Sequence, residues 1–415
     1  MDDRAIDELI RARPPRRALE RPFYCDPDLF EREMERVISR QWLLVDHASR
    51  IPDQGDFFLF EIAGESIVVV RGKAGAIHSF FNVCRHRGSR VCLERQGHNR
   101  QFVCPYHAWT YELDGALRSA PRMPKEFVPA DVRLSSCHVR VLDGLIFLNI
   151  TEGTPTDFDE QVEPLLPFLR VHGLGAAKVA HREIYPTEAN WKLVVENFME
   201  CYHCAPAHPQ FSSVHSRAKI LALGAGPGSG SAEAMAAFQP EFDAWQEKAR
   251  SLGHPTGLFC EKLGSPYWRS GERVPIGRGF LTESQDGQPL APLMGDFKDY
   301  DGGQTSISFN PLGHLLMSND TATLFRFTPT GPTTSEMEVI WLVAEHAREG
   351  VDYDVKRVSW MWDVTTQQDQ IITKNNHAGV MSRRYRPGPY SELEGSVENT
   401  VLWYLDLMAR PTASS

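Results

Sequence analysis

Apolar residues near the start of the chain recur at helical spacing. Asp26-Pro27 has the form of a helix start, with an aspartate as the cap and a proline at the first helical position. The apolar residues that follow are Phe30, Met34, Val37, Ile38 and Trp42. Their spacing predicts a helix whose apolar face packs on a core. We therefore expect residues 1–42 to form a helical segment that packs on the C-terminal domain.

The hydrophobic period changes between Asp46 and Ile150. Short apolar runs separated by glycine-containing turns are "GDFFLFEIAGESIVVVRG", "GAIHSFFNV", "RQFVCPYHAWTYELDG" and "VLDGLIFLNI". Such runs are typical of β-strands joined by tight turns. We expect an all-β domain over residues 43–152. The segment that follows, "TEGTPTDFDE", combines Gly, Pro, Thr and acidic residues and indicates a linker.

Residues 153–415 mix helical and strand patterns, so the chain as a whole is predicted to be α+β. "EIYPTEANWKLVVENFMECYHC" has a helical pattern after Thr187, and "VDYDVKRVSWMWDVTTQQDQIITKNNHAGV" predicts a long C-terminal helix. "TLFRFTPTGPTTSEMEVIWLVAE" predicts two strands around a turn. "GAGPGSGSAEAMAA" predicts a flexible insert.

Charge and composition narrow the classes of partner. The 44 Lys and Arg residues against 54 Asp and Glu give a net charge of −10, which argues against nucleic acid but tolerates a cationic small molecule. The opening residues are charged throughout and lack the apolar core of a secretory signal. The longest apolar runs are far shorter than the roughly 20 residues that span a bilayer. With eight cysteines in 415 residues, we expect a cytoplasmic, reduced chain whose cysteine clusters bind metal rather than form disulfides.

The first cluster of metal-binding residue types is Cys84-x-His86 followed, after seventeen residues, by Cys104-x2-His107. Two pairs in two turns can converge on one metal centre. A zinc finger is the first alternative, but it places its two cysteines together and its two histidines together. One cysteine and one histidine on each arm suit a two-iron cluster in which one iron takes two thiolates and the other two imidazoles. Neutral imidazoles raise the reduction potential, which favours an electron relay.

"CRHRG" and "CPYHAWTYELDG" resemble the Rieske [2Fe–2S] motif of ring-hydroxylating oxygenases. The resemblance implies that Cys84 and Cys104 bind one iron, and that His86 and His107 bind the other. The cysteines and histidine nearby that fall outside the motif are expected to be core or loop residues; they are Cys92, His98 and Cys137.

The second cluster lies in "NWKLVVENFMECYHCAPAHPQF". Asn197, Glu200 and His203 stand at three-residue steps, so on a helix they would share one face. His208 follows five residues later, which an ideal helix would place well apart from His203. The prolines on either side of His208 predict a bend that brings both imidazoles to one ion.

Two other interpretations of the second cluster remain open from the residues alone. Cys201-x2-Cys204 has the spacing of half a zinc site or of a thioredoxin-like pair, although the chain has no second such pair. His203 and His208 would also be accounted for as two histidines with satisfied hydrogen bonds at a domain interface.

A non-heme Fe(II) that activates O2 takes two histidines and one carboxylate. "TTQQDQIITKNNHAGVMS" in the predicted C-terminal helix offers Asp369, 161 residues after His208, and the family resemblance aligns it with the third ligand. Asp363 is the competitor and is expected to be a solvated or capping charge.

From about Phe23 to "ENTVLWYLDL", the chain resembles the catalytic (alpha-type) subunit of a Rieske non-heme iron oxygenase. The resemblance implies a Rieske domain over 43–152 and a catalytic domain over 153–415, with an antiparallel sheet covered by helices. It also implies a mononuclear iron held by His203, His208 and Asp369. Members form homotrimers in which each Rieske cluster feeds the mononuclear iron of a neighbouring subunit. Because the chain has no NAD or flavin fingerprint, electrons must come from a separate NAD(P)H-dependent flavin and iron–sulfur reductase.

Glu200 and Asn197 are the candidate catalytic residues, and Glu200 indicates the substrate class. The family links its two metal centres through an acidic residue that is usually Asp in aromatic dioxygenases. Glu at this position resembles the branch that includes glycine betaine, carnitine and stachydrine oxygenases, as do "ECYHC" and "DGQPLAPLMGDFKDYDGG". Those enzymes hydroxylate an N-methyl carbon, and the hemiaminal then loses formaldehyde.

Aromatic faces would hold a quaternary ammonium, which has no N–H to donate. The candidates are Tyr202, Phe211, Tyr267, Trp268, Phe309, Trp360 and Trp362. Two alternatives remain: an aromatic ring-hydroxylating dioxygenase alpha subunit, and a Rieske electron-transfer protein without catalysis.

Overall fold

The computed structural model describes residues 1–217, 219–220 and 232–410. The chain divides into two compact units. Residues 39–156 form one, which we call the β unit; residues 1–38 and 157–415 form the other, the mixed unit.

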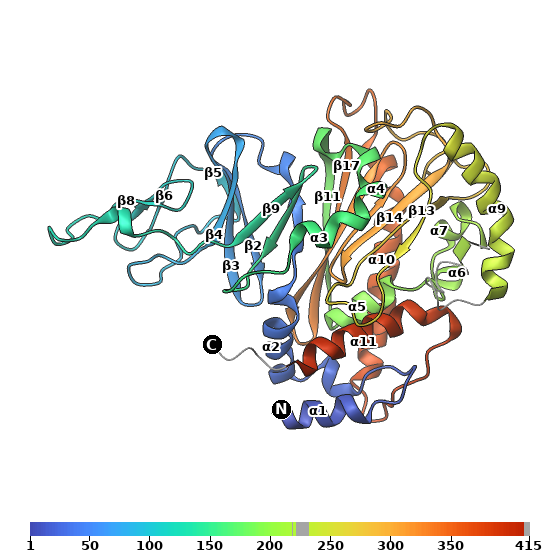
Figure 1. The fold of residues 1–415 in the computed structure, drawn as a ribbon, viewed down its shortest axis with the longest axis horizontal. Coiled ribbons are helices and arrows are strands. Elements are labelled where there is room, and N and C mark those ends of the chain that lie inside the picture. The colour runs from blue at the N-terminus through green and yellow to red at the C-terminus, as the bar shows by residue number, and fades with distance from the viewer. Residues whose placement is uncertain (218, 221–231, 411–415) are drawn as a thin grey trace. The chain divides into compact units, whose positions relative to one another are not determined.

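The β unit consists of three antiparallel sheets (Figure 1). The first has the order β4-β3-β2-β5, the second β1-β10-β9 and the third β6-β7-β8. The strands are β1 Leu43–His47, β2 Asp56–Ile62, β3 Glu65–Arg71, β4 Ile77–Phe81, β5 Gln96–His98, β6 Phe102–Val103, β7 Thr110–Tyr111, β8 Leu117–Ser119, β9 His138–Leu142 and β10 Leu145–Asn149. The glycine-punctuated apolar runs of the sequence are therefore β-strands, as predicted. Alternate residues of β2 and β3 pack with the loops that carry Cys84 and Cys104 into one apolar core.

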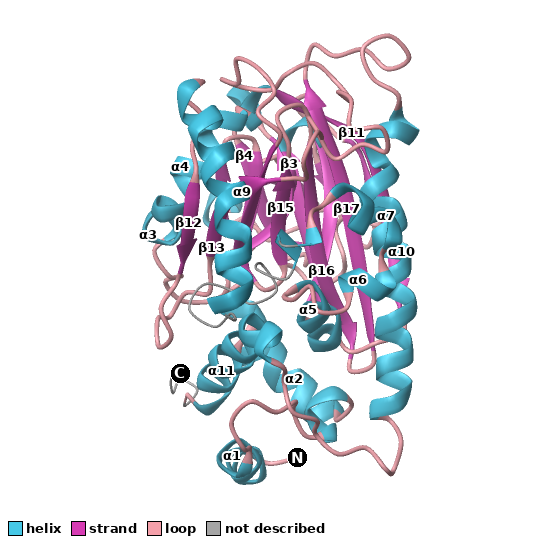
Figure 2. Cartoon of the chain, turned by 90° about the vertical axis from the view of Figure 1, so that its right-hand side faces the viewer, coloured by secondary structure: helices cyan, strands magenta, loops and turns pink. Residues whose placement is uncertain are grey.

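The mixed unit is built on one seven-stranded antiparallel sheet, ordered β11-β17-β16-β15-β14-β13-β12 (Figure 2). Its strands are β11 Ala177–Thr187, β12 Gly257–Cys260, β13 Ser270–Pro275, β14 Gly303–Asn310, β15 Gly313–Met317, β16 Ala322–Gly331 and β17 Thr334–Ala344. β16 and β17 are the predicted strand pair. The predicted α+β class, with an antiparallel sheet covered by helices, is confirmed.

Helices cover both faces of this sheet. The α-helices of this unit with described bounds are α1 Asp3–Ala12, α2 Pro27–Arg36, α3 Phe158–Val162, α4 Leu166–Leu169, α5 Trp191–Phe198, α6 Cys204–Ala207, α7 Pro209–Val214, α9 Ala232–Ser251, α10 Val355–Val380 and α11 Gly395–Ala409. α5 and α10 pack on β16, β17 and β11, whereas α4 packs on β13 and β14. No helix in the described ranges is long and apolar enough to cross a bilayer.

Two helix predictions need correction. α2 starts as predicted, with Asp26 accepting the backbone N–H of Leu29 and Pro27 at the first position, but it ends at Arg36. Trp42 belongs to the β unit, where it directly precedes β1. The predicted flexible insert lies outside the described residues over 224–231, and from Ala232 it is not an insert but the first turns of α9. Alanine and glutamate there favour a helix.

A buried ion pair fixes α5, the helix that leads into the candidate iron site. Glu33 on α2 is fully buried and accepts Nζ of Lys192 at 2.6 Å and Nε1 of Trp191 at 2.8 Å, both on α5. The hydroxyl of Tyr404 on α11 donates to the same carboxylate at 2.5 Å. Burial lowers the pKa of the Lys192 ammonium, and the Glu33 carboxylate opposes that shift. One carboxylate thus joins three helices where they meet.

Candidate active site and metal centres

The two Cys-His loops of the β unit have the same backbone design. In the first, Gly88 N–H donates to the carbonyl of Cys84 at 2.9 Å, and Cys84 N–H donates to Ser89. In the second, Ala108 N–H donates to the carbonyl of Cys104 at 3.0 Å, and Cys104 N–H donates to Trp109. The fifth residue of each loop has a positive φ, 75° at Gly88 and 57° at Ala108. Two loops of equal geometry can therefore present their side chains to one centre, although the histidine stands at a different offset in each.

The four side chains of these loops come together with thiols inside and imidazoles outside. Cys84 and Cys104 are buried, and burial raises the pKa of the Cys84 thiol. The rings of His86 and His107 lie 4.7 Å apart between centroids, and His86 stacks on Trp109 at 4.8 Å. Nδ1 of His86 is buried without a hydrogen-bond partner. An orphaned imidazole nitrogen beside two buried thiols fits the donor set of a [2Fe–2S] cluster with mixed ligands.

In the mixed unit, three side chains converge at the predicted mononuclear site. Oδ1 of Asp369 lies 3.0 Å from Nε2 of His208 and 3.4 Å from Nε2 of His203. The two imidazole rings lie 5.0 Å apart between centroids. Nε2 of His208 is buried and has no hydrogen-bond partner, although Oδ1 of Asp369 lies 3.0 Å away. Two imidazole nitrogens and a carboxylate oxygen around one point fit a non-heme Fe(II) centre.

Each of the three has a second partner that fixes its orientation. Nδ1 of His203 lies 2.5 Å from Oε1 of Glu200, and Nδ1 of His208 lies 2.9 Å from Oε1 of Gln368. Nδ2 of Asn197 donates to Oδ1 of Asp369 at 2.7 Å. These contacts direct Nε2 of both histidines towards the same point, as partners of metal-binding residues usually do. Gln368 was missed, and its place directly before Asp369 on α10 was the available signal.

The helical face predicted for this segment is wrong. α5 ends at Phe198, so only Asn197 of the three residues lies on it. Beyond the helix, Glu200 folds back, and its Oε2 accepts the backbone N–H groups of Tyr202 and His203. His203 and His208 flank the short helix α6. The loop, rather than helical periodicity, brings Glu200 to His203.

The electrostatics match a site for a cation. Burial lowers the pKa of His203, but the carboxylates of Asp369 and Glu200 raise it, to about 9. Burial raises the pKa of Asp369, while its contacts with His203 and His208 outweigh this and hold it below the usual value.

The expectation of a fully reduced chain is wrong for one pair, because Cys201 and Cys204 form a disulfide. Sγ of Cys204 lies within 4.8 Å of the ligating nitrogens of His203 and His208. Since that sulfur is bonded to Cys201, it offers no thiolate, and Asp369 remains the third donor. Of the nearby residues that fall outside the Rieske motif, Cys92 and Cys137 are buried core residues, whereas Nδ1 of His98 lies 2.9 Å from Oδ1 of Asp56.

Asp363, the alternative to Asp369, lies away from the histidines. Its Oδ1 accepts the hydroxyl of Tyr185 at 2.6 Å and Nε2 of Gln367 at 2.7 Å. It is therefore a hydrogen-bonded structural carboxylate rather than a solvated charge.

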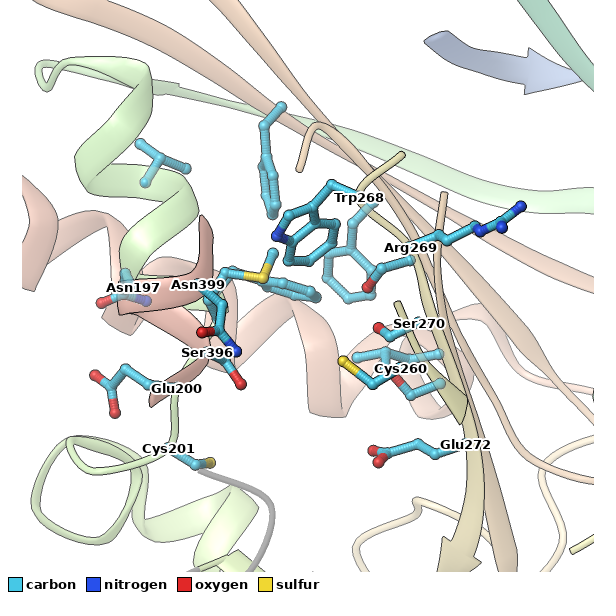
Figure 3. Close-up of a pocket in the computed structure, with 18 of the residues that line it drawn as sticks. Asn197, Glu200, Cys201, Cys260, Trp268, Arg269, Ser270, Glu272, Ser396 and Asn399 are labelled. Atoms are coloured by element: carbon cyan, nitrogen blue, oxygen red, sulfur yellow. The ribbon is translucent and has the colours of Figure 1, made fainter. Parts of the chain in front are cut away.

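A cavity of about 260 Å³ adjoins the three converging side chains. One wall is the sheet, where alternate residues of β13 and β14 face the cavity: Ser270 and Glu272, then Gln304, Ser306 and Ser308. α10 contributes Trp362 and Asp369, and α11 contributes Ser396, Asn399 and Trp403 at helical spacing. Figure 3 shows Asn197 and Glu200 on one side of this cavity, and Ser270 and Glu272 on the other.

Aromatic residues line much of the cavity. Four of the candidates from the sequence do so, namely Phe211, Tyr267, Trp268 and Trp362. Tyr202 is exposed, Phe309 is buried elsewhere, and Trp360 is not in the lining. The residues missed are Phe198, Phe259, Phe325, Phe327 and Trp403.

Comparisons with known proteins match both units. Residues 41–140 match the Rieske [2Fe-2S] domain, and residues 174–410 match the ring hydroxylating alpha subunit (catalytic domain). The chain is 33% identical to the glycine betaine monooxygenase oxygenase subunit of Pseudomonas aeruginosa over 98% of this chain and 92% of that protein. It is 35% identical to the same subunit from Chromohalobacter salexigens over 97% and 88%.

Three further proteins are either more distant or match over less of the chain. The carnitine monooxygenase oxygenase subunit of Escherichia coli is 38% identical, over 46% of this chain and 52% of that protein. Among solved structures, a quaternary ammonium Rieske monooxygenase shares the fold with a TM-score of 0.70 at 21% identity, over 98% of each chain. Naphthalene 1,2-dioxygenase from Rhodococcus shares it with a TM-score of 0.68 at 17% identity, also over 98% of each chain.

Three observations indicate the same family. They are the two domain matches, the relatives that span almost the whole chain, and the two sets of converging donor side chains. A carrier without a catalytic domain is excluded, because the second domain match covers more than half of the chain. The chain belongs to the Rieske non-heme iron oxygenases, as a ring-hydroxylating-type alpha subunit whose cofactors are a Rieske [2Fe–2S] cluster and a mononuclear iron that uses O2.

Proposed function

We propose that this chain is the oxygenase component of a monooxygenase that hydroxylates an N-methyl group of a betaine-like quaternary ammonium compound, such as glycine betaine or stachydrine. The hydroxylated product is a hemiaminal, which loses formaldehyde and leaves the demethylated amine. The hydroxylation consumes O2, two protons and two electrons from a separate NAD(P)H-dependent reductase; one oxygen atom enters the methyl group and the other leaves as water. The observation that carries the proposal is the aromatic cavity directly beside His203, His208 and Asp369.

The lining of the cavity supports a quaternary ammonium substrate. A quaternary nitrogen has no N–H group, so it is recognised by aromatic faces and negative charge rather than by hydrogen bonds. Aromatic residues enter the cavity from the loop before β13, from β16 and from α10, among them Trp268, Phe325 and Trp362. The relatives that span nearly the whole chain are named for glycine betaine, which is a compound of this class.

The residues at the reaction centre have two kinds of role: some would bind the iron, and others orient those ligands. We propose that His203 and His208 hold the iron through Nε2 and that Asp369 holds it through its carboxylate. The cluster and the iron, when bound, supply the electrons and the activation of O2. Asn197 holds the carboxylate of Asp369 in place, and Gln368 does the same for the ring of His208. The cavity wall then presents the methyl group to the metal and excludes water.

We propose that Glu200 couples this site to a Rieske centre in a homotrimer. His107 is exposed on the β unit, so its free nitrogen is accessible to a neighbouring copy. Both oxygens of Glu200 already accept hydrogen bonds within the chain, and each keeps a lone pair for one more. A hydrogen bond from His107 of a neighbouring copy to Glu200 would give the electron a short bridge.

A substrate panel tests the proposal. The purified protein, loaded with both metal centres and coupled to a reductase with NAD(P)H, is offered glycine betaine, stachydrine, carnitine and aromatic acids. The proposal expects O2 uptake and formaldehyde with at least one betaine. Hydroxylated aromatic products without formaldehyde from any betaine would replace it with the aromatic dioxygenase alternative.

A further inference from the structure

One carboxylate in the cavity wall has no assigned partner. Glu272 stands on β13 opposite Ser306 of β14, and its side chain extends from the strand into the cavity (Figure 3). The side chain is largely shielded from bulk solvent. Within the described part of the chain, no cation lies within ion-pair distance of it and no donor hydrogen-bonds to it. A shielded charge without a partner is costly unless a ligand supplies the opposite charge.

The other acidic residues of the cavity lining already contact arginine or histidine side chains. Glu261 pairs with Arg269 at 2.5 Å. Asp369 and Glu200 contact the iron-site histidines. Glu272 is therefore the lining carboxylate that is left for a substrate.

Lys219, the cation whose charge acts on Glu272, is held by other partners. Lys219 is buried and donates from Nζ to Nδ1 of His215 and to Oε1 of Gln304, both at 2.9 Å. Oε1 of Glu283 closes the cluster, since it accepts Nε2 of Gln304 at 2.6 Å and lies 3.0 Å from Nε2 of His215. Lys219 is therefore linked to Glu283 through His215 and Gln304, and it makes no ion-pair contact with Glu272.

We propose that Glu272 is a specificity-determining residue that pairs with the cationic nitrogen of the substrate. The inference rests on the proposed function and deepens it, because it names which wall of the cavity receives the ammonium. Trp268 and Phe259 also line the cavity and would supply aromatic faces to the methyl groups. The charge attracts the nitrogen through the methyl shell without a hydrogen bond. A neutral molecule of the same shape gains nothing from this carboxylate.

The protonation behaviour of Glu272 agrees with this assignment. Burial raises its pKa to about 7, and the ammonium of Lys219 limits the rise. Other titratable groups in this region include Glu283, whose pKa burial raises, His215, whose pKa burial lowers, and Cys260, whose pKa burial raises. A bound permanent cation would favour the ionised carboxylate.

The test compares a zwitterion that carries a quaternary ammonium with a carbon isostere that lacks this positive charge. Glycine betaine and 3,3-dimethylbutanoate have the same shape and carboxylate, and they differ in the charge of the central atom. Binding of each is measured by calorimetry on the metal-loaded parent, on Glu272→Gln, which keeps the size of the side chain, and on Glu183→Gln. Glu183 lies on β11 of the same sheet, and its side chain is half exposed outside the cavity, so its variant is the matched control. The Rieske spectrum and the iron content of each variant show that the fold is kept.

We expect the parent and Glu183→Gln to bind glycine betaine better than the isostere. In Glu272→Gln, betaine affinity falls about tenfold or more, while affinity for the isostere is unchanged or higher. Equal preference for cation and isostere in the parent, or an unchanged preference in Glu272→Gln, overturns the inference. Formaldehyde release by the parent is scored separately. If the parent demethylates a betaine and Glu272→Gln retains its preference, the inference fails while the proposed function stands.

Discussion

Oε1 of Glu200 lies 2.5 Å from Nδ1 of His203, while Nε2 of the same ring faces Asp369. One imidazole therefore joins a carboxylate on its outer side to the iron position on its inner side. When a metal is bound to the neutral ring, a proton on Nδ1 held by Glu200 would leave the lone pair on Nε2 for that metal. In Figure 3, the carboxylate of Glu200 points away from the wall that carries Glu272.

This relationship predicts the effect of Glu200→Gln. The amide keeps the size of the side chain but weakens the hydrogen bond to Nδ1 of His203 and removes the charge from the proposed bridge. We expect both metal centres to remain, with re-oxidation of the reduced Rieske centre by substrate and O2 slowed roughly 10- to 100-fold. Stopped-flow absorbance in a single turnover measures this rate. Re-oxidation at the parent rate would show that Glu200 is not the bridge.

The two aspartates of α10 should respond in opposite ways to alanine substitution. Asp369→Ala removes the carboxylate donor and is expected to abolish turnover and to lower iron content by about one per chain, with the Rieske spectrum intact. Asp363→Ala removes the partners of Tyr185 and Gln367 and should retain iron and turnover, at a stability cost of about 1 kcal/mol. Iron content and turnover are measured on both variants. Loss of iron and turnover in Asp363→Ala, with both retained in Asp369→Ala, would show that Asp363 is the ligand instead.

Substitutions at the proposed Rieske ligands should remove the cluster without affecting iron binding at the mononuclear site. Cys104→Ser removes a buried thiolate donor, so the Rieske-type EPR signal of the reduced protein should disappear. His86→Cys should also abolish that signal, because a thiolate replaces a neutral imidazole and lowers the potential. In both variants, His203 and His208 should still bind iron. A parent protein that is colourless and contains stoichiometric zinc would contradict the cluster assignment.

The buried ion pair between Glu33 and Lys192 should contribute strongly to the free energy of unfolding. Glu33→Gln leaves the Lys192 ammonium buried without its counter-charge, which costs about 3–5 kcal/mol. Glu31→Gln on the same helix is the control, because Glu31 is exposed and its loss should cost under about 0.5 kcal/mol. Chemical denaturation followed by tryptophan fluorescence measures both. Equal midpoints would show that the pair contributes nothing to stability.

Most of the residues proposed to bind the metals could be picked out from the sequence because their spacing is local. Cys84-x-His86 and Cys104-x2-His107 fall in tight turns between strands, and turn geometry is set by a few neighbouring residues. Asp369 needed the family resemblance, since it lies on α10, far along the chain from His208. The structure shows that the two Cys-His loops share one backbone hydrogen-bond pattern. The sequence does not indicate this, because the histidine follows the cysteine by two residues in one loop and by three in the other.

The end of α5 and the residues that line the cavity could not be predicted from local spacing. The pattern around Asn197 continues to look helical, but Glu200 accepts the backbone N–H groups of Tyr202 and His203, and this side-chain turn competes with the helix. Glu272 lies in "SGERVP", where nothing local marks it. Its position follows from strand alternation and from the pairing of β13 with β14. Long-range pairing of this kind is not encoded in local periodicity.

The most direct test of the central claim is a single turnover without a reductase. The protein, with its Rieske centre reduced chemically, is mixed with O2 and glycine betaine or stachydrine, and formaldehyde is measured per mononuclear iron. The account predicts formaldehyde approaching one equivalent with the preferred betaine and none when O2 or the betaine is omitted. Oxidation of the Rieske centre with no formaldehyde from any betaine, together with a hydroxylated ring product from an aromatic acid, would contradict it.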